Sequence, residues 1–144
     1  MRPALQEKNF EIENIWLKRY ISTDNEMRVF MRDVLKLFKA LSDGQRLRIL
    51  KMLEVRPLCV CEITEVLQLA TSTVSKHLSI LRDADLIRDE KDGKWVNYSL
   101  NTSQSGEYST QILPLVSRWL PAEDLILQDA EKVRSVDRNV ICGA

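Results

Sequence analysis

The sequence predicts a mostly α-helical protein with one small β element. Long segments carry apolar residues at helical spacing, one Asp-Gly pair separates two extended runs, and the chain holds only 4 Gly and 4 Pro. With 144 residues and 44% hydrophobic content, the chain can bury one core, because domains commonly span roughly 100 to 150 residues. We therefore expect one folded domain with terminal extensions.

The first part of the chain predicts three helices. Helical spacing of apolar side chains indicates a short helix over residues 10–21, a second from about residue 26 to residue 41, and a third over residues 45–55. Ser42-Asp43 is expected to end the second helix and cap the third. Pro57 is expected to end the third, because proline disfavours helical backbone in the residue before it. The apolar residues of the three stripes are Ile12, Ile15 and Trp16; Phe30, Val34, Leu37, Phe38 and Leu41; and Leu47, Ile49, Leu50 and Leu53.

The middle of the chain predicts a helix-turn-helix. A helix over residues 60–67 and a second one ending near residue 84 are joined by a three-residue connector, and Thr71 or Ser72 is expected to cap the second. Projection of the second helix places Val74, Leu78 and Leu81 inward and short polar side chains outward, on a face that could enter a major groove. The candidate DNA contacts on this helix are Ser72, Thr73, Ser75, Lys76 and His77, and packing is an equal alternative for the histidine.

A β-hairpin is predicted directly after the helix-turn-helix. Asp92-Gly93 separates extended runs at residues 88–91 and 94–100, and this pair favours a two-residue turn because both positions need positive φ. The hairpin would be the wing of a winged helix-turn-helix. Lys91 and Lys94 bracket its tip as candidate phosphate contacts, although neighbouring acidic residues oppose them. Val96, Tyr98 and Leu100 are expected to face inward.

The remaining residues predict a C-terminal helical region. A polar linker over residues 101–110 precedes an apolar stripe at 112–120 and a weaker helix at 122–136, after which the chain is expected to fray. The apolar faces at residues 12–16 and 112–120 are candidate dimer surfaces, with ordinary core packing as the alternative. The expected divisions are an N-terminal arm (1–25), a winged helix-turn-helix domain (26–103) and a dimerisation helix with a tail (104–144).

The charge balance gives no overall support for a nucleic-acid partner. Lys plus Arg and Asp plus Glu both number 21, so any DNA-facing field must be local. No apolar run approaches the ~18 residues of a membrane span, and the N-terminus does not resemble a signal peptide. We therefore expect a soluble, cytoplasmic protein.

Three cysteines, Cys59, Cys61 and Cys142, are the candidate ligands of a soft ion. An odd number in a cytosol-like chain favours free thiols over a disulfide framework. Paired thiolates suit thiophilic ions such as As(III), Sb(III), Cd(II), Pb(II) or Zn(II). Residues at i and i+2 do not face each other on a helix, so a shared ion would require a distorted first turn, and that distortion would weaken DNA binding. A position near a helix N-terminus would also lower the thiol pKa values. The alternative is an ordinary buried pair.

Residues 35–100 resemble the ArsR/SmtB family of bacterial metal- and metalloid-responsive winged-helix repressors. The matching segments are LFKALSDGQRLRILKML, PLCVCEITEVL, ATSTVSKHLSILRDADLI and DGKWVNYSL, which cover a little under half of the chain. The resemblance implies a homodimer that binds an inverted repeat in double-stranded DNA and releases it when an inducer binds. It also implies that Cys59 and Cys61 are inducer ligands. By the same resemblance, the residues that contact DNA are Ser72, Thr73, Ser75, Lys76 and His77.

Some positions depart from the family pattern. The segment LCVCE is similar to the family's arsenical-sensing motif, which often has a third cysteine three positions after the second, where this chain has Thr64. A trigonal As(III) site then needs Cys142 from either protomer, or a solvent or thiol ligand. Cys142 could equally be a tail residue. The family's Asp and His site on the dimer helix has no counterpart, because residues 111–144 contain no histidine. Gly44 stands where proline is frequent, and Asp85 where glycine precedes the wing.

The leading hypothesis is a dimeric repressor released by arsenite, antimonite or another thiophilic ion, with no cofactor needed for folding. A second hypothesis keeps DNA binding but makes the thiols a redox or reactive-sulfur switch. A dithiol oxidoreductase is a remote third, because no His, Asp or nucleophile constellation accompanies the thiols and no catalytic residue is predicted. A fourth is a winged-helix module without an inducer.

Overall fold

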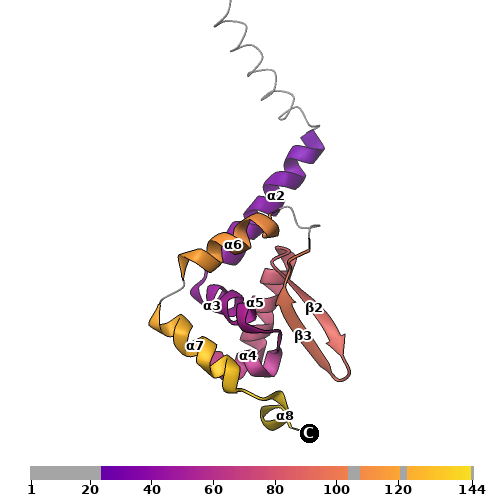
Figure 1. Cartoon of the computed structure of the whole chain (residues 1–144). Helices are drawn as coiled ribbons and strands as arrows, with labels where there is room; N and C mark the ends of the chain where they lie inside the picture. The colour runs from indigo at the N-terminus through magenta and orange to yellow at the C-terminus, as the bar shows by residue number, and fades with distance from the viewer. Residues whose placement is uncertain (1–23, 104–107, 121–122, 144) are drawn as a thin grey trace, which may run out of the picture. The chain divides into compact units, whose positions relative to one another are not determined.

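The computed structural model describes residues 24–103, 108–120 and 123–143, with side chains from Met31 onward (Figure 1). The chain divides into two units, residues 1–35 and residues 36–144. The first unit contributes the beginning of α2, and the arm expected before it lies outside the described residues, as does its apolar face at 12–16. The elements are α2 (Asp24–Leu41), α3 (Gly44–Val55), β1 (Leu58–Cys59), α4 (Val60–Leu67), α5 (Thr71–Asp83), β2 (Ile87–Asp92), β3 (Trp95–Leu100), α6 (Ser109–Trp119), α7 (Asp124–Ser135) and α8 (Arg138–Ile141).

The turn between α2 and α3 is fixed by polar contacts in both directions. The Asp43 side chain caps α3, accepting hydrogen bonds from the amides of Gln45 and Arg46 at 2.9 and 3.0 Å. The buried Arg46 side chain returns toward α2 and donates to the carbonyls of Lys39 and Ala40 at 2.6 and 2.7 Å. These bonds satisfy terminal backbone groups that a helix leaves unpaired. The predicted cap at Asp43 is confirmed.

Helices α4 and α5 form the predicted helix-turn-helix. They pack against each other, and Gln68 makes the turn between them with a left-handed φ of 55°. The expected inward face of α5 is confirmed, because Val74, Leu78 and Leu81 are all buried. The predicted cap is wrong: Ala70 holds the cap position without a side-chain bond, so Thr71 begins the helix one residue earlier than a Thr71 cap would allow.

The sheet has three strands instead of the expected two. Its order is β1-β3-β2, and β1 pairs antiparallel with β3 through Leu58↔Tyr98 and Cys59↔Asn97. A strand of two residues has too few positions to show an alternating pattern, so the sequence did not reveal it. Asp85, which stands where the family has glycine, adopts a left-handed conformation before the hairpin, with φ 56°.

The wing turn differs in detail from the prediction. Asp92 pairs with Trp95 at the end of the strands, so the two-residue turn consists of Gly93 and Lys94. Of the two positions expected at positive φ, only Gly93 has it, at 60°. Tyr98 and Leu100 pack against the core as expected, but Val96 lies farther out on the hairpin and is exposed.

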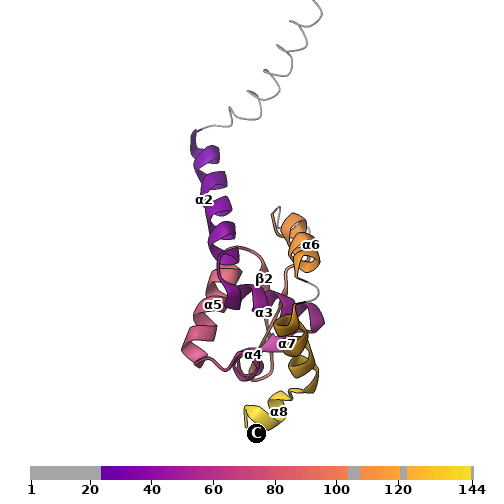
Figure 2. The same ribbon diagram turned by 90° about the vertical axis from the view of Figure 1, so that its left-hand side faces the viewer.

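Helix α3 lies at the centre of the second unit, between α5 and α7 (Figure 2). Its buried residues Ile49, Leu50 and Met52 belong to the main core cluster. Asp129 of α7 binds Arg48 of α3 at 2.7 and 2.9 Å and anchors the C-terminal region. The residues after α7, expected to fray, instead form α8, which contacts α4. None of the described helices is long and apolar enough to cross a membrane.

Candidate sulfur site and nucleic-acid interface

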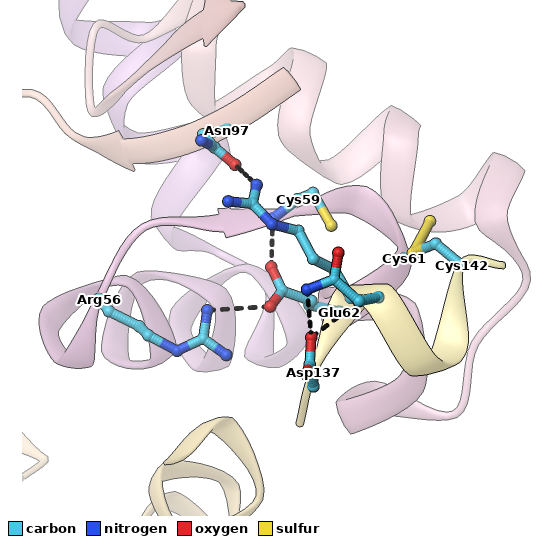
Figure 3. The surroundings of a disulfide bond; sticks show 9 residues. Arg56, Cys59, Cys61, Glu62, Asn97, Asp137 and Cys142 are labelled. Carbon is cyan, nitrogen blue, oxygen red and sulfur yellow. Dashed lines mark hydrogen bonds and ion pairs between the residues drawn. A yellow bond between two sulfur atoms is a disulfide. The ribbon is translucent and has the colours of Figure 1, made fainter. Parts of the chain in front are cut away.

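The three cysteines meet at the start of α4. Cys59 comes from β1, Cys61 from the first turn of α4 and Cys142 from the end of α8, and their sulfur atoms all lie within 4.8 Å of one another (Figure 3). Cys59 is buried, with 2% of its surface exposed. Cys61 and Cys142, 81 residues apart, are joined as a disulfide. The cluster is thus built from three elements, only two of which are adjacent in sequence.

The expected distortion of the helix is not needed to bring Cys59 and Cys61 together. Cys59 is the cap residue of α4 and has extended backbone, with φ −87° and ψ 167°. The rule that residues at i and i+2 diverge applies within a helix, and only Cys61 is within it. The sulfurs therefore converge in a regular structure, so the premise that ligation must deform the first turn is wrong.

A partly buried ion pair supports the strand-to-helix junction beside the thiols. Oε2 of Glu62 accepts a hydrogen bond of 2.8 Å from the Cys59 amide, and its Oε1 lies 2.9 Å from Nη1 of Arg56. Glu62 is only 3% exposed, and burial of a carboxylate without such partners would be costly. Arg56 also donates to the carbonyls of Val133 and Val136 at 2.9 Å each. One arginine thus links the thiol junction to the end of α7.

Two expectations about thiol chemistry are corrected. Burial raises the pKa of the Cys59 thiol, and the Glu62 carboxylate raises it further, although the Glu62 amide acts in the opposite direction. The helix N-terminus therefore does not produce a readily ionised thiol at Cys59, because desolvation outweighs it. The expectation of three free thiols holds for Cys59 only, since the disulfide joins the other two. The docking of α8 against α4 brings Cys142 to that position.

The outward face of α5 carries most of the predicted DNA contacts. Ser72, Thr73, Ser75 and Lys76 are all exposed. His77 lies at the edge of this face, with Nδ1 3.4 Å from Nη1 of Arg46 and 4.0 Å from the Asp43 carboxylate. These contacts favour the packing alternative for the histidine and leave a short polar surface available to DNA.

The two wing lysines are also exposed. Lys91 is in β2 and Lys94 is in the turn, where its ammonium lies 4.7 Å from the centre of the Trp95 ring. Arg138 of α8 approaches the same ring, at 5.9 Å. The sequence analysis did not identify Arg138 or Arg56 as part of a site. Arg138 lies in a segment without helical or strand periodicity. The spacing from Cys59 to Glu62 resembles a capping box and could have identified the carboxylate.

Comparison with known proteins identifies the family. Residues 43–89 match the model described as a bacterial regulatory protein of the arsR family. The arsenical resistance operon repressor of Escherichia coli (strain K12) is 33% identical over 109 residues, which cover 74% of this chain and 83% of that protein. The chain belongs to the ArsR family. The resemblance seen in the sequence is confirmed.

Other ArsR-family comparisons agree. The arsenical resistance operon repressor of Bacillus subtilis (strain 168) is 40% identical over 82 residues, covering 56% of this chain and 78% of that protein. The solution structure of a homodimeric winged helix-turn-helix DNA-binding domain from Mycobacterium bovis, a possible ArsR-family regulator, is 25% identical with a TM-score of 0.56 and covers 67% of this chain and 85% of that one. By family and fold, the protein is a DNA-binding transcriptional repressor and not an enzyme.

Proposed function

We propose that this repressor is released from its operator by a trivalent metalloid, arsenite or antimonite, bound by Cys59, Cys61 and Cys142. The convergence of three sulfur atoms within 4.8 Å carries the proposal. Thiolates are soft donors that prefer thiophilic ions, and three of them complete the shell of trivalent arsenic. Cys142 supplies the sulfur that Thr64 cannot. The relatives named as arsenical resistance operon repressors support the choice of inducer.

The reaction is a condensation that balances without a redox change at arsenic. Arsenous acid exchanges three As–O bonds for three As–S bonds, and the three thiol protons leave with the three hydroxides as water. A protonated Cys59, which its raised pKa favours, is therefore a competent partner. The Cys61–Cys142 disulfide must first take up two electrons and two protons from a reductant. The ion-binding form is accordingly the reduced protein.

The thiol cluster is placed to influence DNA binding because α4 carries Cys61 and packs against α5. We propose a homodimer that contacts two operator half-sites through the exposed face of α5 and through Lys91 and Lys94, since paired half-sites suit a two-fold dimer. The homodimer in the Mycobacterium bovis structure supports this assembly. Trp119 of α6, 63% exposed, and Phe38 of α2, 65% exposed, are apolar surface that a second copy would cover.

Binding of a promoter fragment from upstream of the protein's own coding sequence tests this function. We expect arsenite or antimonite to weaken binding of the reduced protein, and zinc to have little effect. X-ray absorption on the arsenite-loaded protein should show three sulfur neighbours and no short As–O distance. Unchanged DNA binding with both metalloids would refute the inducer, and two sulfurs with one oxygen would refute Cys142 as a ligand.

Matched variants test whether Cys142 supplies the third sulfur ligand of arsenic. Cys142→Ser should lose one As–S neighbour and weaken the response, whereas Thr64→Cys in that background should restore three sulfurs. Thr64 is one helical turn after Cys61, at the spacing that places side chains on the same face, and its buried hydroxyl has no hydrogen-bond partner among the described residues. Identical arsenite affinity of wild type and Cys142→Ser would argue against the three-thiol site.

The disulfide favours a second candidate function, a redox-responsive repressor. A two-electron oxidant such as diamide would convert the Cys61 and Cys142 thiols into the disulfide and be reduced to the hydrazine by the two protons and two electrons. Under this alternative, oxidation changes promoter binding, a reductant reverses the change, and metalloids have no effect. The same promoter assay therefore separates the two candidates.

A further inference from the structure

The six residues from Asp137 to Cys142, here called the tail, contact both the thiol cluster and the wing. Cys142 ends the tail in the cluster. Four residues earlier, Nη1 of Arg138 donates a hydrogen bond of 2.7 Å to Oδ1 of Asn97, and its Nη2 lies 3.5 Å from the carboxylate of Asp92. The guanidinium also lies near the Trp95 ring. One short segment therefore connects the sulfur site with the hairpin that carries Lys91 and Lys94.

The contacts of Arg138 reach from the thiol strand to the tip of the wing. Asn97 of β3 is the strand partner of Cys59, and its amide also donates to Asp92 at 3.3 Å. Asp92 directly precedes the turn at Gly93. Arg138 contacts Asn97, Asp92 and the Trp95 ring, and the hydrogen bond to Asn97 is the shortest of these contacts. A short hydrogen bond from a charged donor is a strong one. The pair with Asp92 is longer and more exposed, so it contributes less.

The outer part of the wing has little other support. Residues 88–92 of β2 are all exposed, and an isolated two-stranded hairpin is only marginally stable in water. A contact from outside the hairpin therefore has a large influence on its position. The tail in turn is loosely packed: a cavity of about 460 Å³ lies between it and helices α4 and α7, and Val140 of α8 is 79% exposed. The bond at Cys142 is thus a principal anchor of the tail.

The geometry points to the tail as a latch that transmits the state of the sulfur site to the wing through Arg138. When Cys142 is held, either by an ion shared with Cys59 and Cys61 or by the disulfide with Cys61, Arg138 is docked on Asn97 and Asp92 and the wing is fixed. When Cys142 is a free thiol, the tail leaves and the wing moves. The ion-dependent half rests on the proposed function, whereas the disulfide-dependent half does not. Arg138 is a positioning residue and does not bind the ion.

Hydrogen exchange of the wing in the full-length protein tests the latch. Deuterium uptake of peptides covering residues 87–100 is compared in the reduced, arsenite-loaded and diamide-oxidised protein. We expect exchange in the wing to be about threefold to tenfold slower in the two forms that hold Cys142, as for the loss of one charge-assisted hydrogen bond in a locally opening segment.

Variants identify Arg138 as the link. Arg138→Ala should bind arsenite and form the disulfide as wild type does, yet show no slowing of exchange in the wing. Arg134→Ala removes an exposed arginine from the last turn of α7 and should retain the slowing. Asn97→Ser removes the amide oxygen that accepts the bond from Arg138, and its shorter hydroxyl does not replace that oxygen. It should therefore reproduce Arg138→Ala even if that variant folds poorly.

Each outcome decides the inference. If hydrogen exchange in the wing is still slowed in both Arg138→Ala and Asn97→Ser, the latch is overturned. Equal exchange in the reduced, arsenite-loaded and oxidised wild type would overturn it as well. Loss of arsenite binding in Arg138→Ala would also overturn it, since the arginine would then belong to the ion site. If the wild type does not bind arsenite, the proposed inducer fails, and the comparison of reduced with oxidised protein still tests the latch.

Discussion

The thiol cluster draws its atoms from β1, α4 and α8, across 81 residues between Cys61 and Cys142, whereas the exposed polar face of α5 lies within a few consecutive residues. The α5 face is supported from beneath by Val74, Leu78 and Leu81, which are part of the main core. The cluster is bounded on one side by the buried residues Cys59 and Glu62 and on the other by the tail. The two regions therefore differ in how firmly each is held.

This difference suits a sensor attached to a DNA-binding unit. A reading face that is fixed by the core keeps its shape whether or not an inducer is present. A site completed by a loosely packed tail can change without unfolding the domain, because segments with few buried contacts open at low free-energy cost. The Arg56–Glu62 pair connects the two sides, because Arg56 binds Glu62 beside the thiols and the carbonyl of Val136 directly before the tail.

The largest predicted effect comes from removing the anchor of α7. Asp129 is 1% exposed and binds Arg48 with both carboxylate oxygens, so Asp129→Ala leaves an arginine charge unpaired in a mostly buried position. We expect a loss of about 3–5 kcal/mol in the free energy of unfolding, measured by urea denaturation. Asp124→Ala, in the exposed first turn of α7, should cost no more than about 0.5 kcal/mol. Equal losses for the two variants would contradict the anchoring role.

The next effect separates DNA reading from ion binding. Lys76→Glu places an acid on the exposed face of α5, and we expect it to weaken promoter binding by about tenfold to a hundredfold and to reduce the salt dependence by about one counterion per half-site. Arsenite stoichiometry should be unchanged. Lys132→Glu, at an exposed lysine on α7, is the matched control. Similar DNA affinity of the two variants would show that α5 does not contact DNA through this face.

The same contrast explains what the sequence could reveal. The α5 face and the helix bounds depend on local periodicity and caps, so Val74, Leu78 and Asp43 could be placed from spacing alone. The position of Cys142 depends on long-range packing of α7 and α8, which no local pattern encodes. The strand β1 was missed for a related reason, since its two residues are identified by their pairing with β3 and not by their own spacing. The raised pKa of Cys59 likewise follows from burial, which required the fold.

The smallest predicted effect concerns Asp43, which caps α3 and lies near His77 of α5. Burial opposes ionisation of this carboxyl, but the amides of Arg46 and Gln45 and the charges of Arg46 and His77 outweigh it and hold its pKa below the usual 3.8. A lowered pKa in the folded state stabilises the fold above the pKa of the unfolded chain, and this stabilisation is lost as the pH falls through the folded value.

Asn caps a helix about as well as Asp, so Asp43→Asn removes only the charge and should cost about 0.3–1 kcal/mol at pH 6. The difference between wild type and variant should shrink as the pH is lowered from 5 to 2.5, measured by urea denaturation at each pH. If the difference in the free energy of unfolding stays constant over that range, the Asp43 charge does not stabilise this turn. Asp43 would then stabilise the turn through its hydrogen bonds alone.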